Sequence, residues 1–117
     1  LGRESVVLVT DAMAAAGMPD GDYVLGPAAV TVADGVARLR DGGAIAGGTA
    51  HLIDVVRTTW RGGVDLVDAV YAASCQGAEI LGDRSIGALE PGRWADLVVA
   101  DAELAPVRVL RRGEVVG

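Results

Sequence analysis

An aspartate that directly follows an apolar run is the residue of this chain best placed for chemistry. Val6–Val9 form the run, Thr10 ends it, and Asp11 comes next. A buried parallel strand has such a run, and in barrel enzymes the reacting groups lie where the strands end. A carboxylate there can act as a general base or acid. The position also suits an aspartate that caps a helix or a turn, so these residues leave both interpretations open.

Three other features could carry chemistry. Glycines 42, 43, 47 and 48 bracket a short apolar loop. Their backbone N–H groups could hold a phosphate near a helix N-terminus, or the glycines could simply allow close packing. The spacing matches neither a P-loop nor a dinucleotide fingerprint. His51 and Cys75 both fall in expected helices, where a packing role is the simpler interpretation, so we leave both out of the site.

The elements that must position these residues follow from the apolar pattern. We expect a strand over residues 5–10, then a small β element beginning at residues 23–25. A hairpin of residues 30–33 and 36–39 turns at Asp34-Gly35, a pair suited to a type I′ turn. One helix is expected over residues 49–61, capped by Thr49, and a second from Asp65, running on through Gly77 to Gly82.

The last part of the chain has the pattern of a small sheet. Pro91-Gly92 suits a type II turn, and residues 95–100, 107–110 and 114–116 read as strands. We therefore predict a mixed α/β fold with two parts, residues 1–82 and residues 83–117.

The composition limits the classes of binding partner and the cellular compartment that we expect for this chain. The net charge is -6 with a pI near 4.5, so the chain has no basic field to attract nucleic acid. The single cysteine cannot form an internal disulfide, and no apolar run reaches the roughly 18 residues of a membrane span. We expect a cytoplasmic protein that binds neither nucleic acid nor membrane.

Three segments resemble the N-acetylglucosamine-6-phosphate deacetylases, members of the metal-dependent amidohydrolase superfamily. Residues 10–21 (TDAMAAAGMPDG) are similar to the block that ends the last barrel strand of these enzymes. Residues 43–48 (GAIAGG) are similar to their Gly-Thr-Leu-Ala-Gly-Ser segment. Residues 87–99 (GALEPGRWADLVV) resemble the closing signature of the superfamily, which many amidohydrolases share.

The resemblance implies a fold and a reaction. Residues 1–82 would be the last part of a (β/α)8 metal-dependent hydrolase barrel, and residues 83–117 the C-terminal strands of a small β-sandwich domain. The intact parent enzyme, expected to be a homo-oligomer, would convert N-acetylglucosamine 6-phosphate to glucosamine 6-phosphate and acetate.

The resemblance also implies roles for particular residues. Asp11 would be the general base and acid, and the main chain of Ile45, Ala46 and Gly47 would touch the amino-sugar phosphate. A divalent metal ion, zinc or similar, would be held by a Glu and two His outside this chain, so no metal ligand is expected here. The Arg and His residues that hold the phosphate would also come from outside it.

Two alternatives stay open at this point. The parent could be another amidohydrolase, dihydroorotase-like or an amino-acid deacylase, or the chain could be a non-enzymatic α/β interaction module. A closed barrel needs roughly 250 residues, and this chain has 117. We therefore expect a fragment that alone holds no catalytic metal, does not deacetylate sugars, and leaves the apolar residues 6–9 with an unpaired edge.

Overall fold

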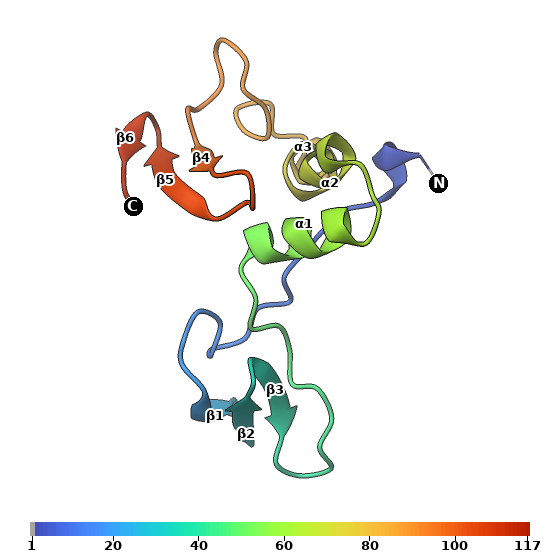
Figure 1. Cartoon of the computed structure of the whole chain (residues 1–117), viewed down its shortest axis with the longest axis vertical. Coiled ribbons are helices and arrows are strands. Elements are labelled where there is room, and N and C mark those ends of the chain that lie inside the picture. The colour runs from blue at the N-terminus through green and yellow to red at the C-terminus, as the bar shows by residue number, and fades with distance from the viewer. Residues whose placement is uncertain (1) are drawn as a thin grey trace. The chain divides into compact units, whose positions relative to one another are not determined.

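The computed structural model of the chain describes residues 2–117, which divide into two compact units. We call Val9–Val55 the hairpin unit. The residues up to Leu8 together with Val56–Gly117 form the second, which we call the helical unit. Each contains one three-stranded antiparallel sheet, and all the helices longer than one turn follow the hairpin sheet in the chain (Figure 1). The mixed α/β composition that the sequence predicts is present.

The hairpin unit is built on strands β1 (Gly21–Leu25), β2 (Ala28–Ala33) and β3 (Val36–Leu39), in that order. The predicted hairpin is confirmed, because Ala33 pairs with Val36 across a two-residue turn. Asp34 and Gly35 have φ of 51° and 72°, the left-handed conformation that a type I′ turn requires. The Asp20 carboxylate accepts hydrogen bonds from both turn N–H groups, at 2.6 and 3.1 Å.

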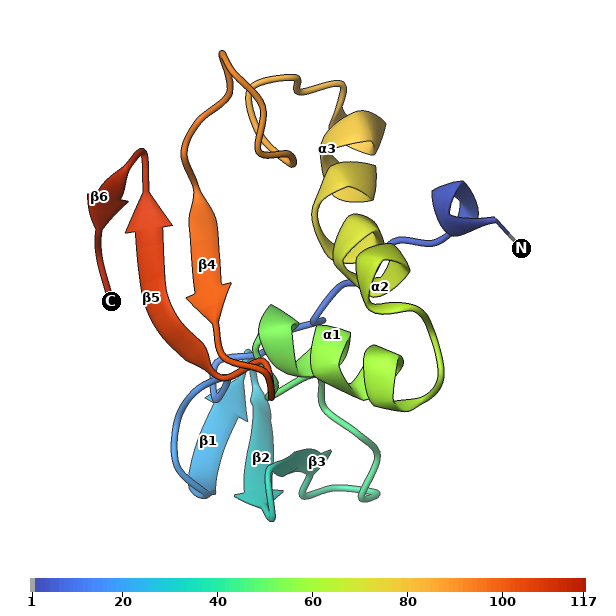
Figure 2. The same cartoon turned by 45° about the horizontal axis from the view of Figure 1, so that its top comes forward.

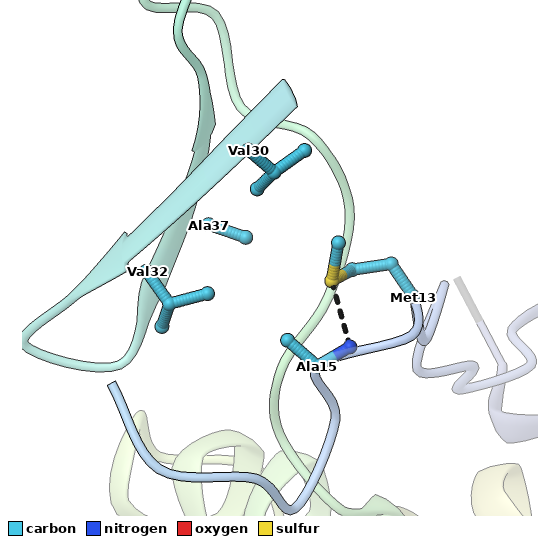
Figure 3. Close-up of a cluster of buried hydrophobic side chains, with 5 residues drawn as sticks. All are labelled: Met13, Ala15, Val30, Val32 and Ala37. Atoms are coloured by element: carbon cyan, nitrogen blue, oxygen red, sulfur yellow. Dashed lines mark hydrogen bonds between the residues drawn. The ribbon is translucent and has the colours of Figure 1, made fainter. Parts of the chain in front are cut away.

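Alternation along the strands places one face of this sheet on a small core (Figure 3). Val30 and Val32 of β2 and Ala37 of β3 are buried, together with Met13 and Ala15 from the preceding loop. The Met13 sulfur also accepts a hydrogen bond from the Ala15 N–H at 3.1 Å. The loop that begins at Asp11 is therefore fixed to the sheet by burial of the residues just after it.

Three helices follow, α1 (Leu52–Arg61), α2 (Leu66–Ala73) and α3 (Cys75–Leu81). The first begins three residues later than predicted, so His51 precedes the helix and does not lie within it. The His51 carbonyl accepts from the Val55 N–H, and the Asp54 carboxylate accepts from the His51 N–H at 3.0 Å. His51 therefore occupies the capping position expected for Thr49, whose hydroxyl donates instead to the Gly35 carbonyl.

The ends of α2 and α3 follow the predicted signals. The Asp65 carboxylate caps α2 by accepting from the Val67 N–H, and Gly82 ends α3 with φ of 68°. The single helix predicted from Asp65 to Gly82 is wrong, because the chain breaks at Ser74, whose hydroxyl donates to the Val70 carbonyl, and forms two helices. As predicted, α3 runs through Gly77 without a break. Cys75 is the first residue of α3, half-buried, with its thiol donating to the Gly87 carbonyl at 2.8 Å.

Strands β4 (Leu97–Ala100), β5 (Pro106–Arg111) and β6 (Glu114–Val115) form the second sheet, seen from another side in Figure 2. Their antiparallel pairing agrees with the three predicted strands. The Pro91-Gly92 turn is also present, since the Arg93 N–H donates to the Glu90 carbonyl and Gly92 has φ of 91°. No helix within residues 2–117 is long and apolar enough to cross a membrane.

The strand predicted over residues 5–10 is wrong for this structure. Arg3–Ser5 form a short 3-10 helix, η1, and residues 6–10 belong to no strand. A parallel strand needs a neighbouring strand to complete its hydrogen-bond ladder. Within residues 2–117, the main chain of residues 6–10 has only a hydrogen bond from the Leu8 N–H to the Ala72 carbonyl and a close approach of the Thr10 carbonyl to Gly48. Val6, Val7 and Val9 remain 41%, 40% and 68% exposed, so the apolar run is not buried among the described residues.

Candidate active site

Asp11 lies just before the first buried residues of the hairpin unit, with its own side chain exposed. Its φ is 48°, a left-handed conformation that costs most residues energy but is tolerated better by aspartate. Within residues 2–117 the Asp11 carboxylate has no hydrogen bond to a backbone N–H and no ion pair. The described contacts therefore give no support to a capping role, and the carboxylate stays open to solvent.

The segment at residues 45–48 lies against Asp11 through the main chain. The Gly48 N–H donates to the Asp11 carbonyl at 2.7 Å, and the Met13 N–H donates to the Gly48 carbonyl at 3.0 Å. Ala12 and Gly48 form a parallel bridge. Residues 45–48, which come 34 to 37 positions after Asp11 in the chain, are thus its neighbours in the hairpin unit.

The other side of this segment is bonded to β3. The Ala46 N–H donates to the Ala37 carbonyl at 2.9 Å, and the Leu39 N–H donates to the Ala44 carbonyl at 2.8 Å. Ile45 lies between these bonds and pairs with Arg38. In such a non-hydrogen-bonded pair, the N–H and C=O of each residue point away from the partner strand.

Main-chain groups of the segment therefore remain available. No hydrogen bond among the described residues uses the N–H or C=O of Ile45 or Gly47, or the C=O of Ala46. The Ile45 side chain is 68% exposed, so the segment is not covered. A run of unpaired main-chain donors and acceptors is an arrangement that can hold an amide or a sugar hydroxyl.

Two glycines allow this close approach. Gly47 has φ of 127°, and a Cβ there would lie 3.1 Å from the Met13 Cβ and 3.2 Å from the Asp11 carbonyl oxygen. A Cβ on Gly48 would lie 1.9 Å from the Thr10 carbonyl oxygen. The two segments therefore approach one another more closely than a side chain at residue 48 would allow.

The sequence analysis predicted neither the close approach of Gly48 to residues 10 and 11 nor the pairing of Ile45 with Arg38 of β3. Arg38 donates through its guanidinium to the Gly43 carbonyl at 3.0 Å, which places it along the same segment. The alternation of side chains along a strand could have identified Arg38. Ala37 and Leu39 face the core, so the residue between them must face away from it.

Nearby charges in the hairpin unit are engaged with one another. Asp22 forms an ion pair with Arg40 and accepts from the Thr31 hydroxyl at 3.0 Å. Hydrogen bonds from Arg40 and Thr31 hold the pKa of the Asp22 carboxyl below its usual value. The ion pair raises the pKa of Arg40 in turn. Neither group is therefore free to act on a substrate.

A metal site cannot be built from the part of the chain that the structure describes. Residues 2–117 contain no group of three His, Cys, Asp or Glu side chains placed to hold an ion. His51 is exposed, and its ring lies against Gly17, whose added Cβ would be 2.9 Å from the His51 Cε1. Asp11 alone cannot complete a catalytic zinc site, which uses about three protein ligands.

A hollow of about 620 Å³ lies in the helical unit and includes Cys75 in its lining. Its polar groups are largely paired. The Tyr71 hydroxyl donates to Glu79, which raises the pKa of Tyr71, and Arg93 is bonded to Glu90. The Cys75 thiol is bonded to a carbonyl. This hollow therefore offers no open nucleophile or base comparable to Asp11.

Comparison with known proteins agrees with the segment similarities. A model of the amidohydrolase family matches residues 5–116. The chain is 40% identical to an N-acetylgalactosamine-6-phosphate deacetylase of Escherichia coli O157:H7, over 96% of the chain and 30% of that protein. It is 36% identical to an N-acetylglucosamine-6-phosphate deacetylase of Vibrio furnissii, over 95% of the chain and 28% of that protein.

A solved structure shows the same fold over this length. An aspartate-to-alanine variant of N-acetyl-D-glucosamine-6-phosphate deacetylase from Mycobacterium smegmatis, in complex with N-acetyl-D-glucosamine-6-phosphate, is similar with a TM-score of 0.86 and 42% identity. The match covers 97% of this chain and 31% of that one. The chain therefore spans less than a third of the length of these three relatives. Because the family model matches nearly all of its residues, the chain belongs to the amidohydrolase family.

Proposed function

We propose that the intact parent enzyme removes the acetyl group from N-acetylglucosamine 6-phosphate, giving glucosamine 6-phosphate and acetate. The observation that carries this proposal is the main-chain contact between Asp11 and Gly48, which brings the segment with unpaired main-chain groups next to the residue that carries the exposed carboxylate. Relatives named as N-acetylglucosamine-6-phosphate deacetylases support it. Family membership also favours an enzyme over an interaction module.

Asp11 is the proton carrier in this proposal. Amide hydrolysis forms a bond from a water oxygen to the acetyl carbon and breaks the bond from that carbon to nitrogen. A carboxylate beside the water takes its proton as the new bond forms, then returns it to the departing amine. Asp11 suits both steps because its carboxylate is exposed and has no cation to neutralise it among the described residues.

The main chain of Ile45, Ala46 and Gly47 orients the substrate. The unpaired N–H and C=O groups match the donor and acceptor pattern of an acetamide and of sugar hydroxyls. Backbone groups held between β3 and residues 11–13 cannot rotate away, so the substrate amide is held in one geometry relative to Asp11.

A divalent metal ion, zinc or similar, would polarise the acetyl carbonyl and lower the pKa of the attacking water. The described residues do not fit such a site by themselves. We propose that the Glu and two His that hold it in these enzymes belong to the two-thirds of the family's length that this chain does not match.

The proposal also covers the architecture of the intact parent enzyme. We propose that residues 1–82 complete a (β/α)8 barrel and that residues 83–117 join a small β-sandwich, in a homo-oligomeric enzyme. The exposed valines at residues 6, 7 and 9 support a barrel strand that needs its neighbours. A phosphorylated sugar is ionised and does not cross membranes unaided, which favours a cytoplasmic enzyme.

The galactosamine epimer is a second candidate substrate. An Escherichia coli relative at 40% identity is named for N-acetylgalactosamine 6-phosphate, which differs from the glucosamine compound only at the C4 hydroxyl. The ratio of kcat/KM for the two sugars separates the candidates. We expect the glucosamine compound to be preferred, and a clear preference for its epimer would reverse the assignment.

The test is acetate release by the intact parent protein and by its Asp11→Asn variant. We expect kcat to fall by about 10² or more, the usual scale for loss of a general base, with bound metal unchanged. Asp41→Asn is the matched control, because Asp41 is also an exposed aspartate of the hairpin unit and has no side-chain partner in the structure described. Near-normal turnover by Asp11→Asn would refute the role.

A further inference from the structure

We propose that Asp41 is a site of spontaneous isoaspartate formation, a covalent change of the main chain that needs no catalyst and is independent of the proposed function. The reaction is favoured where an aspartate is followed by glycine, since a residue without a Cβ leaves its nitrogen unshielded. The hairpin unit contains three such pairs, at residues 20–21, 34–35 and 41–42. Their hydrogen bonds differ, and among the described residues only the third pair is open to the reaction.

The reaction is a cyclisation followed by hydrolysis. The Gly42 nitrogen forms a bond to the side-chain carboxyl carbon of Asp41, the bond from that carbon to its hydroxyl oxygen breaks, and the N–H proton leaves with the hydroxyl as water. Water then opens the cyclic imide. Breaking the bond from nitrogen to the side-chain carbon restores aspartate. Breaking the bond from nitrogen to the main-chain carbonyl carbon gives isoaspartate, in which the chain runs through the former side chain.

Both reacting groups of the Asp41-Gly42 pair are free within the part of the chain that the structure describes. The two residues are exposed and lie in the turn that follows β3. No hydrogen bond or ion pair engages the Asp41 carboxylate, and no hydrogen bond uses the Gly42 N–H. A Cβ added at Gly42 would meet no atom within 4 Å, so no neighbouring group confines the turn. Ring closure here breaks no hydrogen bond of the protein.

The other two pairs are held by one another. The Asp20 carboxylate accepts hydrogen bonds from the Asp34 and Gly35 N–H groups, at 2.6 and 3.1 Å. The carboxylate of the first pair and the nitrogen of the second are therefore both engaged. Gly21 and the residues on either side of the Asp34-Gly35 turn also belong to paired strands. Ring closure at either pair has to break these hydrogen bonds first.

The modified turn lies just before the segment at residues 45–48. Isoaspartate adds one carbon to the main chain between residues 41 and 42, three residues before Ile45. Hydrogen bonds on both sides confine this added length. The Arg40 N–H donates to the Ala29 carbonyl at 2.9 Å, and the Leu39 N–H donates to the Ala44 carbonyl at 2.8 Å. The turn can therefore absorb the change while the sheet stays paired, so modified protein should accumulate in the folded state.

The experiment incubates the intact parent protein in heavy-oxygen water at neutral pH, because each cyclic imide that hydrolyses takes one oxygen from the solvent. Trypsin in ordinary water then gives a peptide of residues 4–38, which contains the first two pairs, and one that begins at residue 39 or 41 and ends at residue 57. The second peptide should take up at least about fivefold more heavy oxygen per pair, the factor that corresponds to one protecting hydrogen bond. An isoaspartyl methyltransferase should add a methyl group to that peptide and not to residues 4–38.

Incubation in urea is the control for sequence, because the unfolded chain should label the two peptides equally per pair. Asp41→Glu keeps the charge but closes a larger ring far less readily, so it should remove the label from the second peptide. Asp41→Asn should keep the label, with ammonia in place of water as the leaving group. Equal labelling per pair in the folded protein, the same preference in urea as in buffer, or a label that persists in Asp41→Glu would overturn the proposal.

Discussion

Replacing Gly47 by alanine tests whether the close approach of residues 45–48 to Asp11 organises the site. The Gly47 φ of 127° lies in a region that residues with a Cβ rarely adopt, at a cost of about 1–3 kcal/mol. The new Cβ would also lie 3.1 Å from the Met13 Cβ, closer than an ordinary contact. Overpacking of this kind costs about 1–3 kcal/mol, so we expect Gly47→Ala to destabilise the hairpin unit by about 2–6 kcal/mol.

Hydrogen exchange in the intact parent protein measures this effect locally. The amides to follow are those of Gly48 and Met13, which bond to the Asp11 and Gly48 carbonyls. Each 1.4 kcal/mol of lost local stability speeds exchange about tenfold, so both amides should exchange at least about tenfold faster. The value of kcat/KM should fall as well, because the substrate segment and Asp11 move apart.

Gly43→Ala is the matched control for backbone strain without steric contact. Gly43 has a left-handed φ of 68°, and an added Cβ would meet no atom within 4 Å. Its expected cost is about 1–2 kcal/mol, with little effect on the Gly48 and Met13 amides. If Gly47→Ala and Gly43→Ala change those amides equally, the close approach is not what holds the site together.

Two further predictions concern stability. Asp65→Ala removes the side-chain cap of α2 and should lower the free energy of unfolding by about 1 kcal/mol, which a urea titration measures. An unchanged urea midpoint would show that the hydrogen bond from the Val67 N–H to Asp65 contributes nothing to stability. The pKa of Asp22 is lowered in the folded protein by hydrogen bonds from Arg40 and Thr31, so the stabilisation it contributes is present above its unfolded pKa and is lost as the pH falls through the folded value. Wild type should therefore have a higher free energy of unfolding than Asp22→Asn near pH 6, and this difference should disappear as the pH falls below the ordinary aspartate range. A difference that does not change with pH would contradict a stabilising ion pair.

Local signals predicted much of the fold. The Asp34-Gly35 turn and the Gly82 helix end depend on the conformations of a few adjacent residues, and the structure has both. The predicted start of α1 at Thr49 is wrong because a contact distant in the chain engages that residue. Thr49 bonds to the distant Gly35 carbonyl, which leaves His51 as the cap.

Non-local contacts account for what the sequence did not predict. Residues 6–9 have the composition of a buried strand, but a strand depends on neighbours, and the described residues supply no ladder for it. The contact between Asp11 and Gly48 and the pairing of Arg38 with Ile45 join segments separated by a hairpin or a loop. The sequence could propose roles for Asp11 and residues 45–47, and only the folded chain shows the main-chain bond between Asp11 and the adjacent Gly48.

The most direct measurement of the proposed site is a crystal structure of the intact parent protein carrying Asp11→Asn, with N-acetylglucosamine 6-phosphate bound. We predict hydrogen bonds of about 2.7–3.2 Å from the main chain of Ile45–Gly47 to the sugar or its acetamide. The side chain at residue 11 should face the amide nitrogen. A sugar bound away from these residues, for example in the hollow beside Cys75, would contradict the account.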